Sequence, residues 1–198
     1  MRIKLFSIMV LLLACGFSAH AQKVAVKTNL LYGAGTLTPN LGVEFGLGKR
    51  TTLDISGGYN PWNREGTATD NKKWVHYLVQ PEFRYWLCER FNGHFFGVHG
   101  LYGQYNVGGI EIPSLFGGDP LMDKAFRYEG SAYGGGISYG YHWMWSKRWG
   151  MEFTLGIGAV QFEYDKYGCD MCADQIEKGS KTYFGPTKAG ISLVFLIK

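Results

Sequence analysis

Hydrophobic and polar residues alternate most clearly between Trp74 and Trp86. Every second side chain in this stretch can lie against hydrocarbon: Tyr77, Val79, Pro81, Phe83 and Tyr85. The side chains between them are mostly polar or charged: His76, Leu78, Gln80, Glu82 and Arg84. A period of two predicts a β-strand with one apolar face. The stretch is 13 residues long; a strand that crosses a bilayer needs about 9–11 residues, whereas an average soluble strand has about five or six.

Seven other stretches alternate in the same way. The predicted strands are 24–34, 40–48, 51–60, 74–86, 94–105, 128–143, 149–164 and 183–198. The connections 61–73, 106–127 and 165–182 are long, and the turns at the opposite strand ends are short, which is typical of an outer-membrane barrel. We therefore predict an all-β fold, an eight-stranded antiparallel transmembrane (outer-membrane) β-barrel. Pro81 is interpreted as a bulge or bend, because proline donates no hydrogen bond to a β-ladder.

Composition agrees with one β-rich domain. The chain has 198 residues, of which 29 are Gly, 16% are aromatic and only 18% are charged, and few stretches have a helical pattern. The net charge of +4 is spread along the chain, without a block of Lys and Arg. A nucleic-acid partner is therefore not expected.

The first 21 residues have the pattern of a secretory signal peptide. Arg2 and Lys4 precede an apolar core, and Ala19-His20-Ala21 is a small-residue cleavage site, so we expect a leader at 1–21 and a barrel domain at 22–198. An alternative is cleavage before Cys15, because the preceding Leu12-Leu13-Ala14 resembles a lipoprotein lipobox. Beyond the leader, no apolar run is long enough for a transmembrane helix.

Aromatic residues gather at the predicted strand ends. Four lie near the short turns: Trp86, Trp143, Trp145 and Trp149. Six lie near the long loops: Tyr59, Trp62, Trp74, Tyr105, Tyr164 and Tyr183. Two aromatic belts are expected at the two surfaces of a membrane. The alternative is that these side chains cover the core of a soluble protein.

The polar faces of the predicted strands carry seven charged residues: Lys27, Glu44, Asp54, Glu82, Arg84, Glu152 and Lys188. An eight-stranded barrel is just wide enough to be filled by side chains, so these charges have to pair inside it. We interpret them as a plug of salt bridges. A proton or ion path is the alternative.

No set of residues predicts catalysis, a metal site or a cofactor. Ser138 and His142 share a strand face but lie about 13 Å apart at about 3.3 Å per residue, and a nucleophile and its base need about 3 Å. We assign structural roles to the four histidines of the barrel, namely His76, His94, His99 and His142. Cys169 and Cys172 are compatible with a redox pair, half of a metal site or a disulfide, and we expect the disulfide in an exported protein.

Several motifs carry a resemblance to a known family. They are 27–32 (KTNLLY), 39–45 (PNLGVEF), 57–62 (GGYNPW), 80–86 (QPEFRYW), 136–141 (GISYGY) and 185–190 (GPTKAG). On these motifs, residues 24–198 resemble an uncharacterised domain-of-unknown-function family of small OmpA-like outer-membrane β-barrels from Gram-negative gut anaerobes. The resemblance implies that the genes of family members lie near fimbrial genes. It implies no catalytic residue. The last residues differ from the usual barrel-insertion signal, in which the terminal residue is aromatic. Here the last aromatic residue is Phe195, three residues before Lys198.

These observations predict a non-enzymatic integral outer-membrane protein with a role in envelope structure or cell-surface interaction. The expected partners are outer-membrane lipid, the barrel-insertion machinery, and a surface or fimbrial partner at loops 61–73, 106–127 and 165–182. A lipid-modifying outer-membrane enzyme is one alternative, and it requires a serine beside a histidine. A soluble periplasmic lipocalin-like binding barrel is the other, and it requires apolar side chains inside and polar ones outside.

Overall fold

The computed structural model describes residues 24–67, 70–110, 122–123, 125–168 and 174–197. The elements in chain order are β1 (Val24–Asn29), α2 (Leu30–Thr36), β2 (Asn40–Gly46), β3 (Thr51–Asn60), β4 (Asn63–Thr67), β5 (Asp70–Trp86), β6 (Gly93–Gly108), β7 (Phe126–Met144), β8 (Trp149–Gly168) and β9 (Gln175–Ile197). No helix in these ranges has the length and apolar character needed to span a bilayer. The expected leader, with Cys15, lies outside the described residues.

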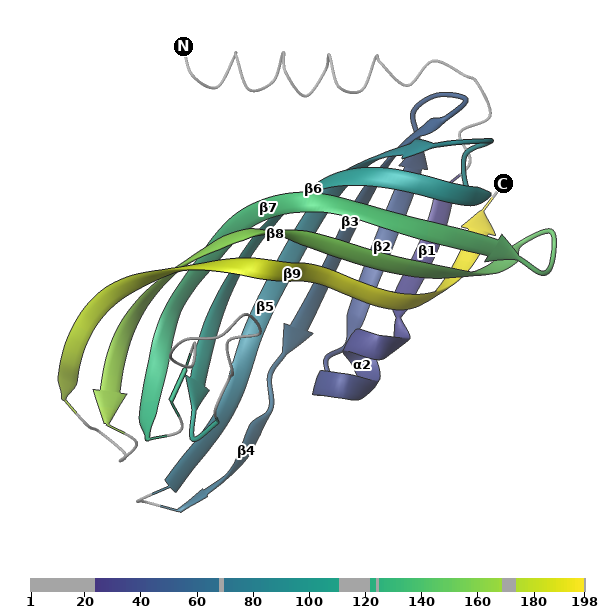
Figure 1. Cartoon of the computed structure of the whole chain (residues 1–198). Helices are drawn as coiled ribbons and strands as arrows, with labels where there is room; N and C mark the ends of the chain where they lie inside the picture. Colours follow the sequence, from purple (N-terminus) through teal and green to yellow (C-terminus); the bar gives the residue numbers. More distant parts are fainter. Residues whose placement is uncertain (1–23, 68–69, 111–121, 124, 169–173, 198) are drawn as a thin grey trace, which may run out of the picture.

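Eight antiparallel strands close into a ring (Figure 1). Each strand of the ring pairs with its neighbours in the order β3-β2-β1-β9-β8-β7-β6-β5, and β3 pairs with β5 to complete the circle. Among the described residues, β4 pairs only with β5, at the end of that strand that projects beyond the ring. The predictions of an all-β fold and of eight antiparallel strands in one barrel-like sheet are confirmed.

The wall of the ring is much taller on one side than on the other (Figure 1). β1 and β2 have six and seven residues, whereas β8 and β9 have 20 and 23. The long strands β5 to β9 continue past the ends of β1 to β3, at the end of the ring where α2 lies. We call this projecting part of β5 to β9 the extension.

Side chains alternate between the interior of the ring and its outer surface. Glu82 and Arg84 are buried inside, while Phe83 and Tyr85 on the same strand are exposed outside. The same alternation places Phe153 outside and Glu152 inside on β8. The apolar set therefore faces outward and the charged set inward.

The prediction of a strand over 24–34 is wrong in its second half. The strand ends at Asn29, and residues 30–36 form the short helix α2. Asn29 causes the change, because its side-chain oxygen accepts a hydrogen bond from the Tyr32 amide (3.1 Å) and so caps the helix. The same side chain donates to the carbonyl of Ala189 (3.0 Å) and accepts from the amide of Ile191 (3.3 Å), and thereby continues the pairing of β9 beyond the end of β1.

The predicted loops are partly strand. Residues 63–67 and 70–73 form a hairpin of β4 and β5, and β8 and β9 reach Gly168 and Gln175 within the segment predicted as the loop 165–182. Polar side chains on both faces hid these strands, because period-two hydropathy requires one apolar face. Of the loop 106–127, residues 111–121 and 124 lie outside the described part of the chain.

Pro81 causes no bulge. The pairs Val79↔Tyr102 and Glu82↔His99 on its two sides have the same register, and Pro81 itself pairs with Ile55. Register shifts occur instead between β8 and β9, at Gly156 and at Lys166. Of the two interpretations of Pro81, a bulge or a bend, the bulge is therefore wrong.

Only some of the aromatic residues predicted at the strand ends face outward, as an aromatic belt requires. Trp143, Trp145, Trp149, Tyr59 and Trp62 are exposed on the outside. Trp86 is fully buried, and three tyrosines pack into interior apolar clusters: Tyr105, Tyr164 and Tyr183. Position at a strand end does not set the face of a side chain; its parity along the strand does.

Candidate functional site

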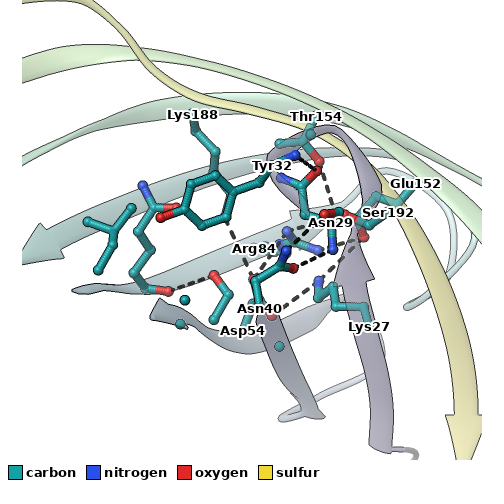
Figure 2. Close-up of a pocket in the computed structure, with 17 residues that line it drawn as sticks. Lys27, Asn29, Tyr32, Asn40, Asp54, Arg84, Glu152, Thr154, Lys188 and Ser192 are labelled. Carbon is teal, nitrogen blue, oxygen red and sulfur yellow. Dashed lines mark hydrogen bonds and ion pairs between the residues drawn. The ribbon is translucent and has the colours of Figure 1, made fainter. Parts of the chain in front are cut away.

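The structure brings the seven predicted charged residues together inside the ring, in what we call the charge layer. Arg84 lies at its centre (Figure 2). Its Nη1 lies 2.8 Å from both Glu44 Oε2 and Glu152 Oε2, and its Nε donates to Glu82 Oε2 at 2.7 Å. Its Nη2 also reaches Asp54 Oδ2 at 3.4 Å. One guanidinium thus contacts four carboxylates from β2, β3, β5 and β8.

Two lysines complete the charge layer. Lys27 Nζ lies 2.6 Å from Glu44 Oε2, 3.1 Å from Asp54 Oδ1 and 3.5 Å from Glu152 Oε2. Lys188 Nζ approaches Glu82 Oε2 at 2.8 Å and Asp54 Oδ2 at 3.7 Å. Three cations therefore face four carboxylates. This pairing is what makes burial of the charges tolerable, because an unpaired buried charge costs several kcal/mol.

Three hydroxyl groups contribute to the charge layer that the sequence interpretation did not include. Thr52 donates to Glu44, Ser138 to Glu82 and Thr154 to Glu152. Alternation along their strands predicts that these three residues face inward. It does not predict which inward-facing Ser or Thr bonds to a carboxylate, because many small polar residues share that face.

Aromatic side chains close the ring at the end opposite the extension. Phe91, in the turn between β5 and β6, is buried against Ala25 and Val194, and its positive φ of 62° lets the turn fold under the ring. Trp86 packs on Phe95 with ring centroids 4.7 Å apart. The Arg84 guanidinium carbon lies 4.3 Å from the centre of the Phe95 ring, which joins this aromatic layer to the charge layer.

A small polar cavity of about 50 Å³ lies on the other side of the charge layer (Figure 2). Tyr32 reaches into the ring from α2, and its hydroxyl lies 2.7 Å from His76 Nε2. Gln80 donates to the carbonyl of Thr187 (3.2 Å) across the same space. The cavity has room for a few water molecules only.

Above the cavity, the interior of the extension is apolar. Leu101, Ala132 and Val160 form one buried cluster, and Val107, Met122 and Tyr128 form a second. Burial raises the pKa of Tyr105 and of Tyr128 at this level. The interior therefore changes along its axis from aromatic to charged, then to polar and then to apolar.

Among the described residues, no histidine is seen beside a serine or a cysteine in a reactive arrangement. Ser138 bonds to Glu82, and neither ring nitrogen of His142 has a hydrogen-bond partner in the described structure. His99 Nε2 lies 2.8 Å from Thr187 Oγ1, and His94 Nδ1 lies 2.6 Å from the Tyr139 hydroxyl. The described residues contain no cluster of His, Cys, Asp and Glu suited to a metal ion. Cys169 and Cys172, the predicted disulfide, lie outside the described residues, and Cys88 is an exposed free thiol.

Comparison with known proteins gives a family but no activity. The model of a family described as protein of unknown function (DUF3575) matches residues 7–197. The chain belongs to the DUF3575 family. This confirms the prediction of an uncharacterised domain-of-unknown-function family. No curated protein matches the chain, and no solved structure matches it either. For this DUF3575 member, function has to be argued from geometry.

Proposed function

We propose that the protein is a non-enzymatic integral protein of the outer membrane, which spans the membrane as an eight-stranded barrel and acts through its extension at the cell surface. The observation that carries the proposal is the order of side chains on the outer face. There, residues paired across β5 to β8 form rows, and the character of the rows changes along the strands.

The apolar rows come first. Phe83, Val98, Ile137 and Ile157 pair across the four strands and form one of them. Val98 and Ile137 are 63% and 61% exposed. Such exposure across a continuous surface is costly in water and favourable in lipid.

Aromatic side chains bound the apolar rows at both ends. Toward the extension, Tyr102 and Tyr133 pair in what we call the tyrosine row. Toward the other end, Trp143 and Trp149 are exposed beside the turn between β7 and β8. Ten steps of about 3.3 Å separate Tyr133 from Trp143, and on a strand tilted by about 40° they span about 25 Å, the height of the apolar band of such barrels.

Polar rows follow beyond the tyrosine row. The first contains Gln104, Ser131 and Glu163, and the second contains Asn106, Glu129 and Asp165. A change from apolar to tyrosine to polar side chains on one face is what the boundary between hydrocarbon and water favours.

The sealed interior supports a role at the surface and not in conduction. The charge layer and the aromatic layer fill the ring, and the cavity between the charge layer and the extension is small. Outer-membrane lipid and the insertion machinery are then the general partners. A surface or fimbrial partner would meet the extension and the neighbouring strand β4, where the described parts of 61–73, 106–127 and 165–182 lie.

Neither alternative function receives comparable support. A lipocalin-like soluble barrel needs apolar side chains inside, whereas Glu44, Glu82 and Arg84 are inside and each about 1% exposed. A lipid-modifying enzyme needs a serine activated by histidine, whereas Ser138 donates a hydrogen bond to the Glu82 carboxylate.

Fractionation of cells tests the proposal. We expect the mature chain in the outer-membrane fraction, resistant to extraction by carbonate, with faster gel mobility when unboiled than when boiled. Recovery of the folded chain in the soluble periplasmic fraction without detergent would overturn the proposal. Labelling of Lys178, in the extension, by an amine reagent that does not cross the membrane of intact cells would support an orientation with the extension at the cell surface.

A further inference from the structure

A groove of about 570 Å³ crosses the outer face of the extension, adjacent to the tyrosine row. Its walls come from β3, β5, β6, β7 and β8, and its lining includes Tyr59, Tyr77, Gln104, Asn106, Glu129 and Asp165. Asn106, Glu129 and Asp165 are direct cross-strand partners, and Tyr59 pairs with Tyr77. The volume lies within the range of small-molecule sites, about 300–1,000 Å³.

The lining combines aromatic faces with groups that both donate and accept hydrogen bonds. Tyr59 is 58% exposed, and the Tyr77 ring lies 6.3 Å from that of Tyr102. Gln104 and Asn106 supply amides, and Glu129 supplies a carboxylate. A sugar needs this combination, because its ring carbons pack against an aromatic ring while each hydroxyl both donates and accepts.

One buried polar atom of the lining has no hydrogen-bond partner among the described residues. It is Asn106 Oδ1, on the outward-facing parity of β6. Buried polar groups are nearly always paired, since leaving one unpaired costs about 1–3 kcal/mol. The unpaired Asn106 oxygen therefore points to a polar ligand in this groove.

The carboxylates of the groove have cations nearby. Glu129 and Asp165 line it together with Lys73, Lys178 Nζ lies 3.8 Å from Asp165 Oδ1, and the Arg127 guanidinium lies over the Tyr167 ring of the lining. Since both signs are present, no charge has to come from the ligand, and a neutral hydroxyl-rich molecule suits the amides and aromatic rings. We propose that this groove is a saccharide-binding site for neutral sugars.

The source of the sugar follows from the proposed function. Gln104 lies two residues beyond Tyr102, or about 7 Å along the strand, so the groove begins where lipid headgroups and attached sugars would lie. The sugar portion of an outer-leaflet glycolipid and a free neutral oligosaccharide share the required chemistry. The location rests on the proposed function, whereas the binding itself does not.

The test uses the purified full-length mature chain in lipid nanodiscs. Binding is measured by saturation-transfer NMR and calorimetry with two sets of probes: neutral gluco-, galacto- and manno-oligosaccharides, and the deacylated headgroup saccharide of a neutral glycolipid. We expect at least one probe to bind. Binding of an oligosaccharide identifies a free sugar as the ligand, and binding of the deacylated saccharide alone identifies a glycolipid.

Matched variants locate the binding. Asn106→Leu should weaken binding about 3–10-fold, the equivalent of one lost neutral hydrogen bond, while Asn92→Leu in the exposed turn at the opposite end should not change it. Tyr59→Ala should weaken binding about tenfold. Tyr141→Ala is the control and should not weaken it, because Tyr141 is exposed on the outer face near the turn between β7 and β8, far from the groove. Equal effects within a pair would overturn the proposal, as would the absence of binding to every probe. Sugar binding by a chain that fractionates as soluble would overturn the proposed function and leave this inference standing.

Discussion

Arg84 and Glu152 form a two-pronged ion pair across the interior of the ring. Arg84 Nη1 lies 2.8 Å from Glu152 Oε2, and Nη2 donates to Oε1 at 3.0 Å. The two residues come from β5 and β8, which are not neighbours in the sheet. The pair therefore ties together two walls that backbone hydrogen bonds do not join directly.

Replacing Arg84 tests how much the charge layer depends on its central cation. Arg84→Met leaves four carboxylates facing two lysines, so the free energy of unfolding should fall by about 3–5 kcal/mol. Urea unfolding in lipid vesicles, followed by gel mobility, measures the change. Arg148→Met, in an exposed turn, is the control and should have no effect beyond about 0.5 kcal/mol. Equal stability of the two variants would contradict a structural role for the charge layer.

A lysine on the outer face distinguishes lipid from water around the ring. Ile137→Lys, in the middle of the apolar rows, should lower the free energy of unfolding by about 2–4 kcal/mol if the site faces hydrocarbon. In a soluble protein the same exposed change usually stays within about 0.5 kcal/mol. Ser131→Lys, on the same strand and face but in the polar rows, is the matched control. A harmless Ile137→Lys would argue against membrane insertion.

Asn29 serves both the helix and the edge of β9, so removing its side chain should loosen both. Asn29→Ala should lower stability by about 0.5–2 kcal/mol, the usual cost of a lost helix cap. Hydrogen exchange should become faster at the amides of Tyr32 and Ile191, which bond to the Asn29 oxygen. The amide of Leu193, whose residue pairs with Thr28 of β1, should be unaffected. Unchanged exchange at Ile191 would show that the side chain does not protect this edge.

Alkaline pH should weaken the extension. Burial raises the pKa of Tyr105 and Tyr128, both of which lie outside the proposed membrane-spanning segments. The unfolded state then loses these protons first, above a pH of about 10, so stability falls as pH rises beyond that value.

Tyr105→Phe makes this pH effect measurable. The variant loses the hydrogen bond to the carbonyl of Glu163 (3.2 Å) but should show a smaller loss of stability between pH 9 and pH 11, roughly the range around the unfolded tyrosine pKa. Urea unfolding at the two pH values provides the comparison, with Tyr141→Phe as an exposed control. A steeper loss in Tyr105→Phe than in the unchanged chain would refute the explanation.

The sidedness of the strands could be predicted from the sequence because it depends only on parity. Phe83 and Arg84 must face opposite sides of a strand, and the narrow interior of an eight-stranded ring forces charges such as Arg84 to meet partners. Which carboxylates Arg84 would contact depended on the stagger of four strands, β2, β3, β5 and β8, and no local pattern encodes that stagger.

Other features were hidden because their causes are not local. Leu30 and Tyr32 continue the period of the first strand, yet the bonds of Asn29 to its own helix and to β9 end the strand there. Trp86 is a tryptophan at a strand end, as expected for an aromatic belt, but it has the same parity as Arg84 and therefore faces the interior. The groove could not be predicted from the sequence, because Tyr59, Asn106 and Asp165 come from three distant segments and meet only through strand pairing.

Because the wall is taller on one side, the two sides of the ring present different surfaces to a partner. A ring of uniform height offers the same rim to every approaching partner, whereas here β8 and β9 rise far beyond β1 and β2 on one side. A macromolecule that docks on the low side would meet α2 and the polar cavity, and one that docks on the high side would meet the polar rows. In the proposed outer-membrane location, rotation about the membrane normal would then decide which surface a neighbour encounters.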